Sequence, residues 1–180
     1  MSRAAEQLAE RLRSAIRDVP DFPKPGILFK DITPVLANAD LFRDVILYFS
    51  RYYENQNIHA IAGIESRGFI FGAPLAMQLG VPFVPFRKLG KLPADKVRVD
   101  YALEYGADSI EAHADSIEPG ARVLVVDDVL ATGGTAEASG RLVQSLGGEL
   151  AGFCIPIELA FLEGRSRLAD TPLHTLIRYE

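Results

Sequence analysis

Two kinds of hydrophobic pattern alternate along the chain. Continuous apolar runs are typical of strands buried on both faces of a parallel sheet. They occupy residues 59–64, 81–86, 123–126 and 151–157, and a shorter one follows at 175–177. Segments with apolar residues at helical spacing lie at 4–17, 40–53, 69–79 and 136–146. Strands that alternate with helices predict an α/β domain with a mainly parallel sheet.

Three further patterns refine this prediction. Apolar residues alternate with polar ones from Val97 to Tyr105, which predicts a strand with one face towards solvent, and Gly106 turns the chain back. Two prolines in the 81–86 run place that strand at an edge or make it short. Prolines between residues 18 and 26 exclude helix, an extended piece follows at 27–34, and Asp40 is the predicted cap of the next helix.

Length and composition indicate one ordinary globular domain over residues 1–180. The chain is 48% hydrophobic and 24% charged, and its net charge of −5 argues against a nucleic-acid surface. Cys154 is the only cysteine, so no intramolecular disulfide forms. No apolar run reaches the ~18 residues of a membrane span, and the amphipathic start is unlike a signal peptide. We therefore expect a cytoplasmic protein without a membrane or nucleic-acid partner.

The candidate functional residues cluster directly after the apolar run 123–126. Asp127 and Asp128 close that run, and a Thr/Gly stretch leads into the next helix. Ligands of open α/β sheets bind at the carboxyl ends of the strands. Free N–H groups at a helix start favour a phosphate, glycines let the backbone approach it, and threonine hydroxyls donate to it. The candidate phosphate ligands are Ala131, Thr132, Gly133, Gly134 and Thr135.

The two aspartates indicate which kind of phosphate compound this stretch would bind. Carboxylates repel a phosphate but accept hydrogen bonds from neutral hydroxyls, so a sugar phosphate satisfies both parts of the stretch. No Lys follows the glycines, as a P-loop needs, and the acids precede the glycines, unlike in a dinucleotide fingerprint. The plainer alternative is an aspartate that caps a glycine turn.

Residues 123–135 resemble the ribose-phosphate motif of the type I phosphoribosyltransferases, which bind 5-phosphoribosyl 1-pyrophosphate. A second stretch, Glu65-Ser66-Arg67-Gly68, repeats the order of strand end, turn and helix start. It resembles the pyrophosphate loop of this family, in the form that the adenine-specific members carry. The resemblance implies pyrophosphate binding by Glu65, Ser66 and Arg67, a catalytic contribution from Arg67, and a cis peptide bond between Glu65 and Ser66.

A basic stretch and a glutamate add to the resemblance to the family around the pyrophosphate loop. Arg87, Lys88 and Lys91 would neutralise the leaving pyrophosphate, although a solvated loop is the alternative. Residues 101–106 resemble the mobile lid loop of the family, in which Glu104 is the catalytic candidate. A surface-strand glutamate is otherwise usually just solvated.

The N-terminal part of the chain contains most of the candidate residues for binding the purine base. Residues 22–34 resemble the adenine-specific hood, which with the first helix occupies residues 1–36. Phe29 would stack on the purine, Leu28 and Lys30 would flank it, and Leu159 would close the other face. Lys30 stands where many relatives have arginine. For Phe29, plain core packing is the alternative.

The resemblance implies the type I phosphoribosyltransferase fold, with helices on both faces of the sheet. It also implies transfer of the phosphoribosyl group to N9 of adenine, giving AMP and pyrophosphate, by a homodimer. Mg²⁺ would be held through substrate oxygens and not by a protein cage. Two alternatives stay open: another base, such as orotate or a 6-oxopurine, and a regulator that binds the sugar phosphate without turning it over.

Overall fold

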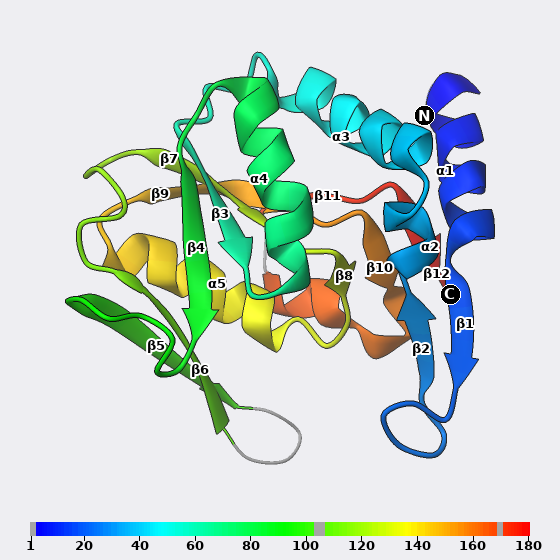
Figure 1. Ribbon diagram of the computed structural model, residues 1–180. Coiled ribbons are helices and arrows are strands. Elements are labelled where there is room, and N and C mark those ends of the chain that lie inside the picture. Colours follow the sequence, from blue (N-terminus) through cyan, green and yellow to red (C-terminus); the bar gives the residue numbers. More distant parts are fainter. Residues whose placement is uncertain (1–2, 103–106, 169–170) are drawn as a thin grey trace. The chain divides into compact units, whose positions relative to one another are not determined.

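A computed structural model describes residues 3–102, 107–168 and 171–180 (Figure 1). Its contacts divide the chain into two compact units, Met1–Phe49 and Ser50–Glu180. The division falls inside a helix, α3 (Ala39–Tyr53). Each unit has its own secondary structure and is described by itself.

The first unit contains α1 (Arg3–Ala15), β1 (Arg17–Pro20), β2 (Leu28–Asp31), α2 (Thr33–Leu36) and the start of α3. The first helix stops earlier than predicted, because the chain turns into β1, which pairs antiparallel with β2. The predicted cap of α3 was wrong. Asn38 Oδ1 accepts the Leu41 N–H at 3.1 Å, whereas Asp40 pairs with Arg43 on the helix surface.

The second unit is built on a seven-stranded sheet in the order β11-β9-β7-β3-β4-β6-β5. The parallel strands are β3 (Ala60–Ile64), β4 (Phe83–Lys88), β7 (Arg122–Val126), β9 (Glu149–Cys154) and β11 (Leu173–His174). At one edge, β5 (Lys96–Ala102) and β6 (Ala107–His113) form an antiparallel hairpin. The mainly parallel sheet is confirmed, and β5 confirms the predicted strand as far as Ala102. β6 runs back antiparallel to β5, as expected, while the predicted turn at Gly106 lies outside the described residues.

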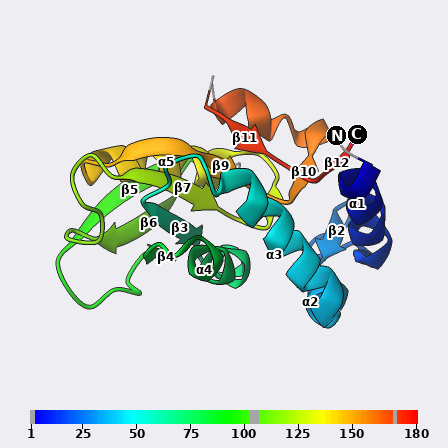
Figure 2. The ribbon, with the colours of Figure 1, turned by 90° about the horizontal axis from the view of Figure 1, so that it is seen from above.

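Two helices cover opposite faces of this sheet. Figure 2 shows α4 (Arg67–Leu79) on one face and α5 (Gly134–Ser145) on the other. The strand β7 between them is buried from Val123 to Val126, as an uninterrupted apolar run requires. Gly80 ends α4 in the left-handed conformation, at φ 68°.

One prediction about the sheet was wrong. β4 lies inside it, between β3 and β6, although it contains Pro85. β6 pairs with β4 only at Arg87 and Lys88, so the missing N–H of Pro85 breaks no bond to β6.

A small second sheet escaped prediction. It consists of β8 (Val129–Leu130), β10 (Ile157–Leu159) and β12 (Ile177–Tyr179), all parallel. Two 3₁₀ helices follow β10, η1 (Ala160–Leu162) and η2 (Gly164–Leu168). β8 ends directly before the loop at residues 131–135, and β10 pairs with β8. Among the described residues, no helix has the length and hydrophobicity that crossing a membrane requires.

Candidate active site

Three neighbouring parallel strands bring the predicted ligands to one edge of the sheet. Gly63 of β3 is aligned with Val126 of β7, and Ile64 is aligned with Phe86 of β4. Glu65, Arg87 and Asp127 therefore follow at the same level, at the carboxyl ends where α/β proteins bind ligands.

The acidic pair is the centre of this edge, with Asp128 buried and Asp127 partly buried. Asp128 is 1% exposed, and its backbone N–H donates to Asp127 Oδ1 at 2.9 Å. Its Oδ2 lies 3.2 Å from Arg67 Nε, an ion pair whose angle leaves this oxygen without a hydrogen bond from the described residues. Burial raises the pKa of Asp127, reinforced by the neighbouring carboxylate. Burial also raises the pKa of Asp128, while Arg67 opposes this shift.

The turn at residues 65–68 is held by charged side chains and by close packing. The peptide bond between Glu65 and Ser66 is cis, as predicted. Glu65 Oε2 accepts from Arg87 Nε at 3.1 Å and from the Lys88 N–H at 2.9 Å. The hydrogen bond from Arg87 is the main reason that the pKa of Glu65 is lowered. A Cβ on Gly68 would lie 2.5 Å from Val126 O and 3.1 Å from Asp127 Cα, so the turn presses directly on the acidic pair.

The loop at residues 131–135 carries no charge of its own. Gly133 precedes α5 in the left-handed conformation, at φ 81°, which suits a residue without Cβ. Thr132 is exposed, whereas Gly133 and Gly134 are buried. The backbone therefore defines the shape of this loop, and the start of α5 supplies free N–H groups.

A chain of side chains links this loop to the β5–β6 hairpin. The Thr135 hydroxyl donates to Tyr101 Oη at 3.2 Å, and the Tyr101 hydroxyl donates to Asp108 Oδ2 at 3.1 Å. Lys88 Nζ lies 3.3 Å from the same Asp108 oxygen. Glu65, Lys88, Tyr101 and Thr135 line one small cavity of about 10 Å³. The 65–68 turn and the 131–135 loop thus face a common space.

Comparisons with known proteins agree with this geometry. A family model described as phosphoribosyl transferase domain matches residues 31–171. The adenine phosphoribosyltransferase of Myxococcus xanthus is 56% identical over 172 residues, covering 96% of this chain and 94% of that protein. This chain belongs to the adenine phosphoribosyltransferase family.

Solved structures of the family have the same fold. The adenine phosphoribosyltransferase from Rhodothermus marinus superposes with a TM-score of 0.92 at 54% identity, covering 97% of this chain and 99% of that one. The enzyme from Saccharomyces cerevisiae, in complex with an imino-altritol bisphosphate and adenine, gives 0.90 at 43% identity, with 96% and 99% covered. The family, the enzyme class and the fold inferred from the sequence are confirmed.

The other candidate pyrophosphate ligands of the family, Arg87, Lys88 and Lys91, lie in and after β4. Arg87 and Lys88 belong to β4 and not to a loop, and the Arg87 guanidinium stands 5.9 Å from the centre of the Phe69 ring. Lys91 is exposed, and its charge contributes to the lowered pKa of Glu65. Glu104 lies outside the described residues.

The candidate adenine ligands of the family divide between the two units. In the first unit, Leu28 is 46% exposed, and the Phe29 ring packs edge to face on Phe22, with 5.1 Å between the ring centres. Lys30 is buried, and its Nζ lies 2.6 Å from Asp18 Oδ1. In the second unit, Leu159 ends β10 and is buried. The role of all four in adenine binding stays a prediction.

The Mg²⁺ that this family is expected to use needs oxygen ligands from the protein or from the substrate. Among the described residues, no cluster of three or more His, Cys, Asp or Glu side chains could hold a metal. Asp127 and Asp128 offer one carboxylate pair, beside the Arg67 cation. Mg²⁺ typically combines one or two carboxylates with substrate phosphates and waters, so this pair fits an ion that the substrate carries.

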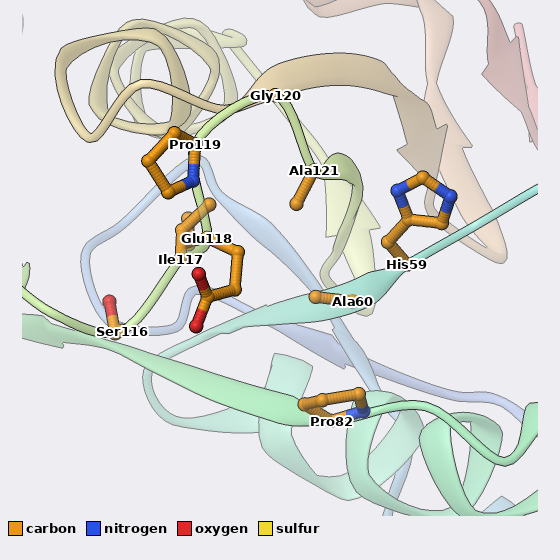
Figure 3. A pocket seen from close by; sticks show the side chains of 9 residues that line it. All are labelled: His59, Ala60, Pro82, Ser116, Ile117, Glu118, Pro119, Gly120 and Ala121. Carbon is orange, nitrogen blue, oxygen red and sulfur yellow. The ribbon is translucent and has the colours of Figure 1, made fainter.

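A second, larger cavity of about 390 Å³ lies at the opposite ends of the strands. Figure 3 shows Ala60, Pro82 and Ala121, which begin or precede β3, β4 and β7, around this cavity, together with His59 and Glu118. The family's ligand motifs are at the carboxyl ends of the same strands, so this cavity is not part of the candidate active site.

Sequence reasoning missed three contributors to the family site. Tyr101 was predicted as an apolar strand position and as the first residue of the lid-like stretch 101–106, but not as a hydrogen-bonding group. Asp108 was not singled out at all, because the hydrogen bonds of both residues depend on the pairing of β5 with β6. Gly164 was a single glycine in a polar stretch, yet its backbone packs against the 131–135 loop.

Proposed function

We propose that this chain transfers the 5-phosphoribosyl group from phosphoribosyl pyrophosphate to N9 of adenine, giving AMP and pyrophosphate. The main support is the junction of the two turns at the acidic pair. Gly68 packs on Asp127, and Arg67 pairs with Asp128, so a ligand with an anion at each end and hydroxyls between them would span the site.

In this proposal each part of the site takes one part of the substrate. The 5-phosphate lies on the backbone N–H groups of the 131–135 loop, with Thr132 and Thr135 donating to it. The ribose hydroxyls donate to Asp127 and Asp128, and charged acceptors make these bonds stronger than neutral ones. The pyrophosphate lies at the 65–68 turn, where Arg67, Arg87, Lys88 and Lys91 supply positive charge.

The reaction follows from this placement. N9 of adenine attacks C1 of the ribose as the bond to pyrophosphate breaks, with inversion at that carbon. Positive charge develops on the ribose ring in the transition state, and in this proposal the carboxylates of Asp127 and Asp128 stabilise it. Negative charge develops on the leaving group, and Arg67 and Arg87 stabilise it. Positioning of the two reactants supplies a further part of the acceleration.

Five finer assignments belong to the same proposal. Glu104 would handle a proton or orient charge during the transfer, and Leu28, Phe29, Lys30 and Leu159 would bind the base. Mg²⁺ would enter on the substrate, where it neutralises phosphate charge. The cytoplasmic location also stays a prediction. A homodimer is supported by the apolar residues that α4 leaves exposed, Ile70 at 38% and Met77 at 82%.

Base specificity tests the proposal. With phosphoribosyl pyrophosphate and Mg²⁺ supplied, kcat/KM for adenine should exceed that for hypoxanthine, guanine or orotate at least ~100-fold, or roughly 2.7 kcal/mol. A site that bonds the amino edge of adenine leaves polar groups unpaired against a 6-oxo edge. Comparable rates with a 6-oxopurine would contradict the assignment, and binding of the sugar phosphate without any product would favour a regulator.

A further inference from the structure

The 131–135 loop rests on the backbone of a turn that lies about thirty residues later in the chain. A Cβ placed on Gly164 would overlap Ala131 O and lie 2.9 Å from Gly133 N. A Cβ placed on Gly133 would overlap Gly164 O. Both contacts join backbone to backbone, so no flexible side chain can move aside. The position of Gly164 therefore fixes the shape of the loop.

An ion pair next to Gly164 fastens this turn. Arg165 Nε donates to Glu158 Oε1 at 2.9 Å, and Arg165 Nη2 donates to Glu158 Oε2 at 2.6 Å. The Glu158 side chain is 3% exposed and the Arg165 side chain 47% exposed. The pair is bidentate, which fixes direction as well as distance. Arg165 also lowers the pKa of Glu158, so this buried carboxylate stays charged.

The Glu158–Arg165 ion pair connects the turn at Gly164 to β10, the strand that also pairs with the start of the 131–135 loop. Glu158 belongs to β10 and is aligned with Leu130 of β8, the residue directly before Ala131. One end of the loop is thus tied to β10 through the β8 pairing, and its middle rests on Gly164, which Arg165 ties to the same strand. In Figure 1 the orange turn after β10 lies beside the start of α5, consistent with the contacts between η2 and α5.

We propose that Glu158 and Arg165 are positioning residues for substrate binding: they hold Gly164 against the 131–135 loop and so set its affinity for the 5-phosphate of the sugar phosphate. We call Glu158, Gly164 and Arg165 the Gly164 clamp. The inference rests on the proposed function in one respect, that this loop binds the phosphate.

Gly164→Ala tests the steric part. Gly164 has an ordinary φ, so the added methyl group acts through the loop and not through backbone strain. The dissociation constant for ribose 5-phosphate, measured by calorimetry, should rise roughly 10- to 100-fold, since a displacement of about 1 Å can cost 10²-fold. Gly140→Ala is the matched control, because its Cβ would meet only side-chain atoms, the end of Leu150 at 2.9 Å and the edge of the Phe153 ring at 3.3 Å, and no backbone of the loop. Its affinity should stay within about twofold of the wild type.

Arg165→Lys and Arg165→Gln test the ion pair. Lysine keeps the charge but loses the two-pronged geometry, so it should restore only part of what glutamine loses. We expect KM for phosphoribosyl pyrophosphate to rise about 3- to 30-fold in Arg165→Gln and less in Arg165→Lys, with KM for adenine nearly unchanged. Arg167→Gln is the control, since it removes a half-exposed cation of the same turn that only approaches Glu137 at 3.9 Å.

The outcomes separate the clamp from the proposed function and from simple destabilisation. Unchanged ribose 5-phosphate affinity in Gly164→Ala and Arg165→Gln would overturn the inference. Equal increases of both KM values with a lowered Tm would also overturn it, since that is the effect of global loosening. A wild-type protein that makes no AMP would contradict the proposed function, and the ribose 5-phosphate titration would still test the clamp.

Discussion

The turn at residues 65–68 and the loop at residues 131–135 share one local plan and differ in how they are held. Each lies after the carboxyl end of a buried parallel strand and leads into a helix, although the two-residue β8 stands between β7 and the second of them. Charged side chains surround the first, where Glu65 binds Arg87 and Arg67 pairs with Asp128. The second contains no charged residue, and the backbone of Gly164 supports it. One of the two candidate anion sites is therefore made by side-chain charge, and the other by backbone shape.

This difference matches the parts of the substrate in the proposed reaction. Pyrophosphate leaves, and side chains such as Arg87 can exchange Glu65 for the leaving group and return. The 5-phosphate stays attached to the ribose throughout, so a fixed cradle can anchor it from substrate to product. A rigid site costs little reorganisation when its ligand does not change.

The pKa values of the carboxyl groups also differ between the two regions. The Arg87 guanidinium lowers the pKa of Glu65, whereas burial raises the pKa of Asp127 and of Asp128. The carboxylate at the 65–68 turn is stabilised as an ion by its partner. Burial disfavours the charged form of the acidic pair, so this arrangement costs stability in the folded protein.

The largest expected effect is on the transfer step, and it should leave binding at both candidate anion sites unchanged. Glu104→Gln should lower kcat by roughly 10- to 1000-fold, the range of general acid–base contributions. The affinities for pyrophosphate and ribose 5-phosphate should not change, because the proposal assigns Glu104 to the transfer step and assigns other residues to both anion sites. Single-turnover rates would check the prediction, and an unchanged rate where chemistry is limiting would leave Glu104 as a solvated residue.

Removal of either acidic charge should have the next largest effect. Asp127→Asn and Asp128→Asn each weaken hydrogen bonds to the ribose worth about 1.5–3 kcal/mol, so kcat/KM should fall roughly 10- to 100-fold or more. Asp128→Asn should also weaken pyrophosphate binding, since it releases Arg67. Steady-state kinetics with product inhibition would measure both, and activity retained by a variant that unfolds would assign that aspartate to the fold.

A crossed pair of substitutions would test the comparison itself. Arg87→Gln should raise the inhibition constant of pyrophosphate about tenfold, as expected for one lost charge-assisted bond, and leave ribose 5-phosphate unaffected. Thr132→Ala should do the reverse, with a smaller increase of about three- to tenfold. If both substitutions weaken both ligands equally, the two sites are not separately organised.

The smallest effect is on stability and its dependence on pH. A carboxyl group with a raised pKa binds its proton more tightly in the folded state, so its contribution to stability falls as the pH rises through that pKa. Asp127→Asn should therefore raise the Tm at pH 8 by about 2–4 °C and by less at pH 5.

Glu65→Gln is the opposite case. Because the pKa of Glu65 is lowered, its carboxylate stabilises the folded state above the ordinary value of 4.5 and loses this effect as the pH falls. The variant should be less stable than the wild type at pH 7, and the difference should disappear in acid. Thermal unfolding of both variants across this range would show whether the two carboxylates carry opposite signs.

Several features followed from the sequence alone, because they depend on neighbouring residues. The uninterrupted run before Asp127 predicted a strand buried on both faces, and β7 is one. The glycines and threonines after it predicted a tight turn at a helix start, and Gly133 takes that position in the left-handed conformation. The turn after Ile64 was located in the same way. Periodicity and turn chemistry are local, so they can be read without knowledge of the rest of the chain.

Other features were decided only by the tertiary structure. Strands β8 and β10 contain two and three residues, too few for any period to appear, and they exist because they pair with each other. Nothing near Arg67 indicates that it meets Asp128, and nothing near Gly164 indicates that a loop rests on it. Such contacts join residues far apart in the sequence, and their geometry is set by the register of the strands between them. A pattern within one segment carries no information about that register, so these partners emerge only when the sheet is assembled.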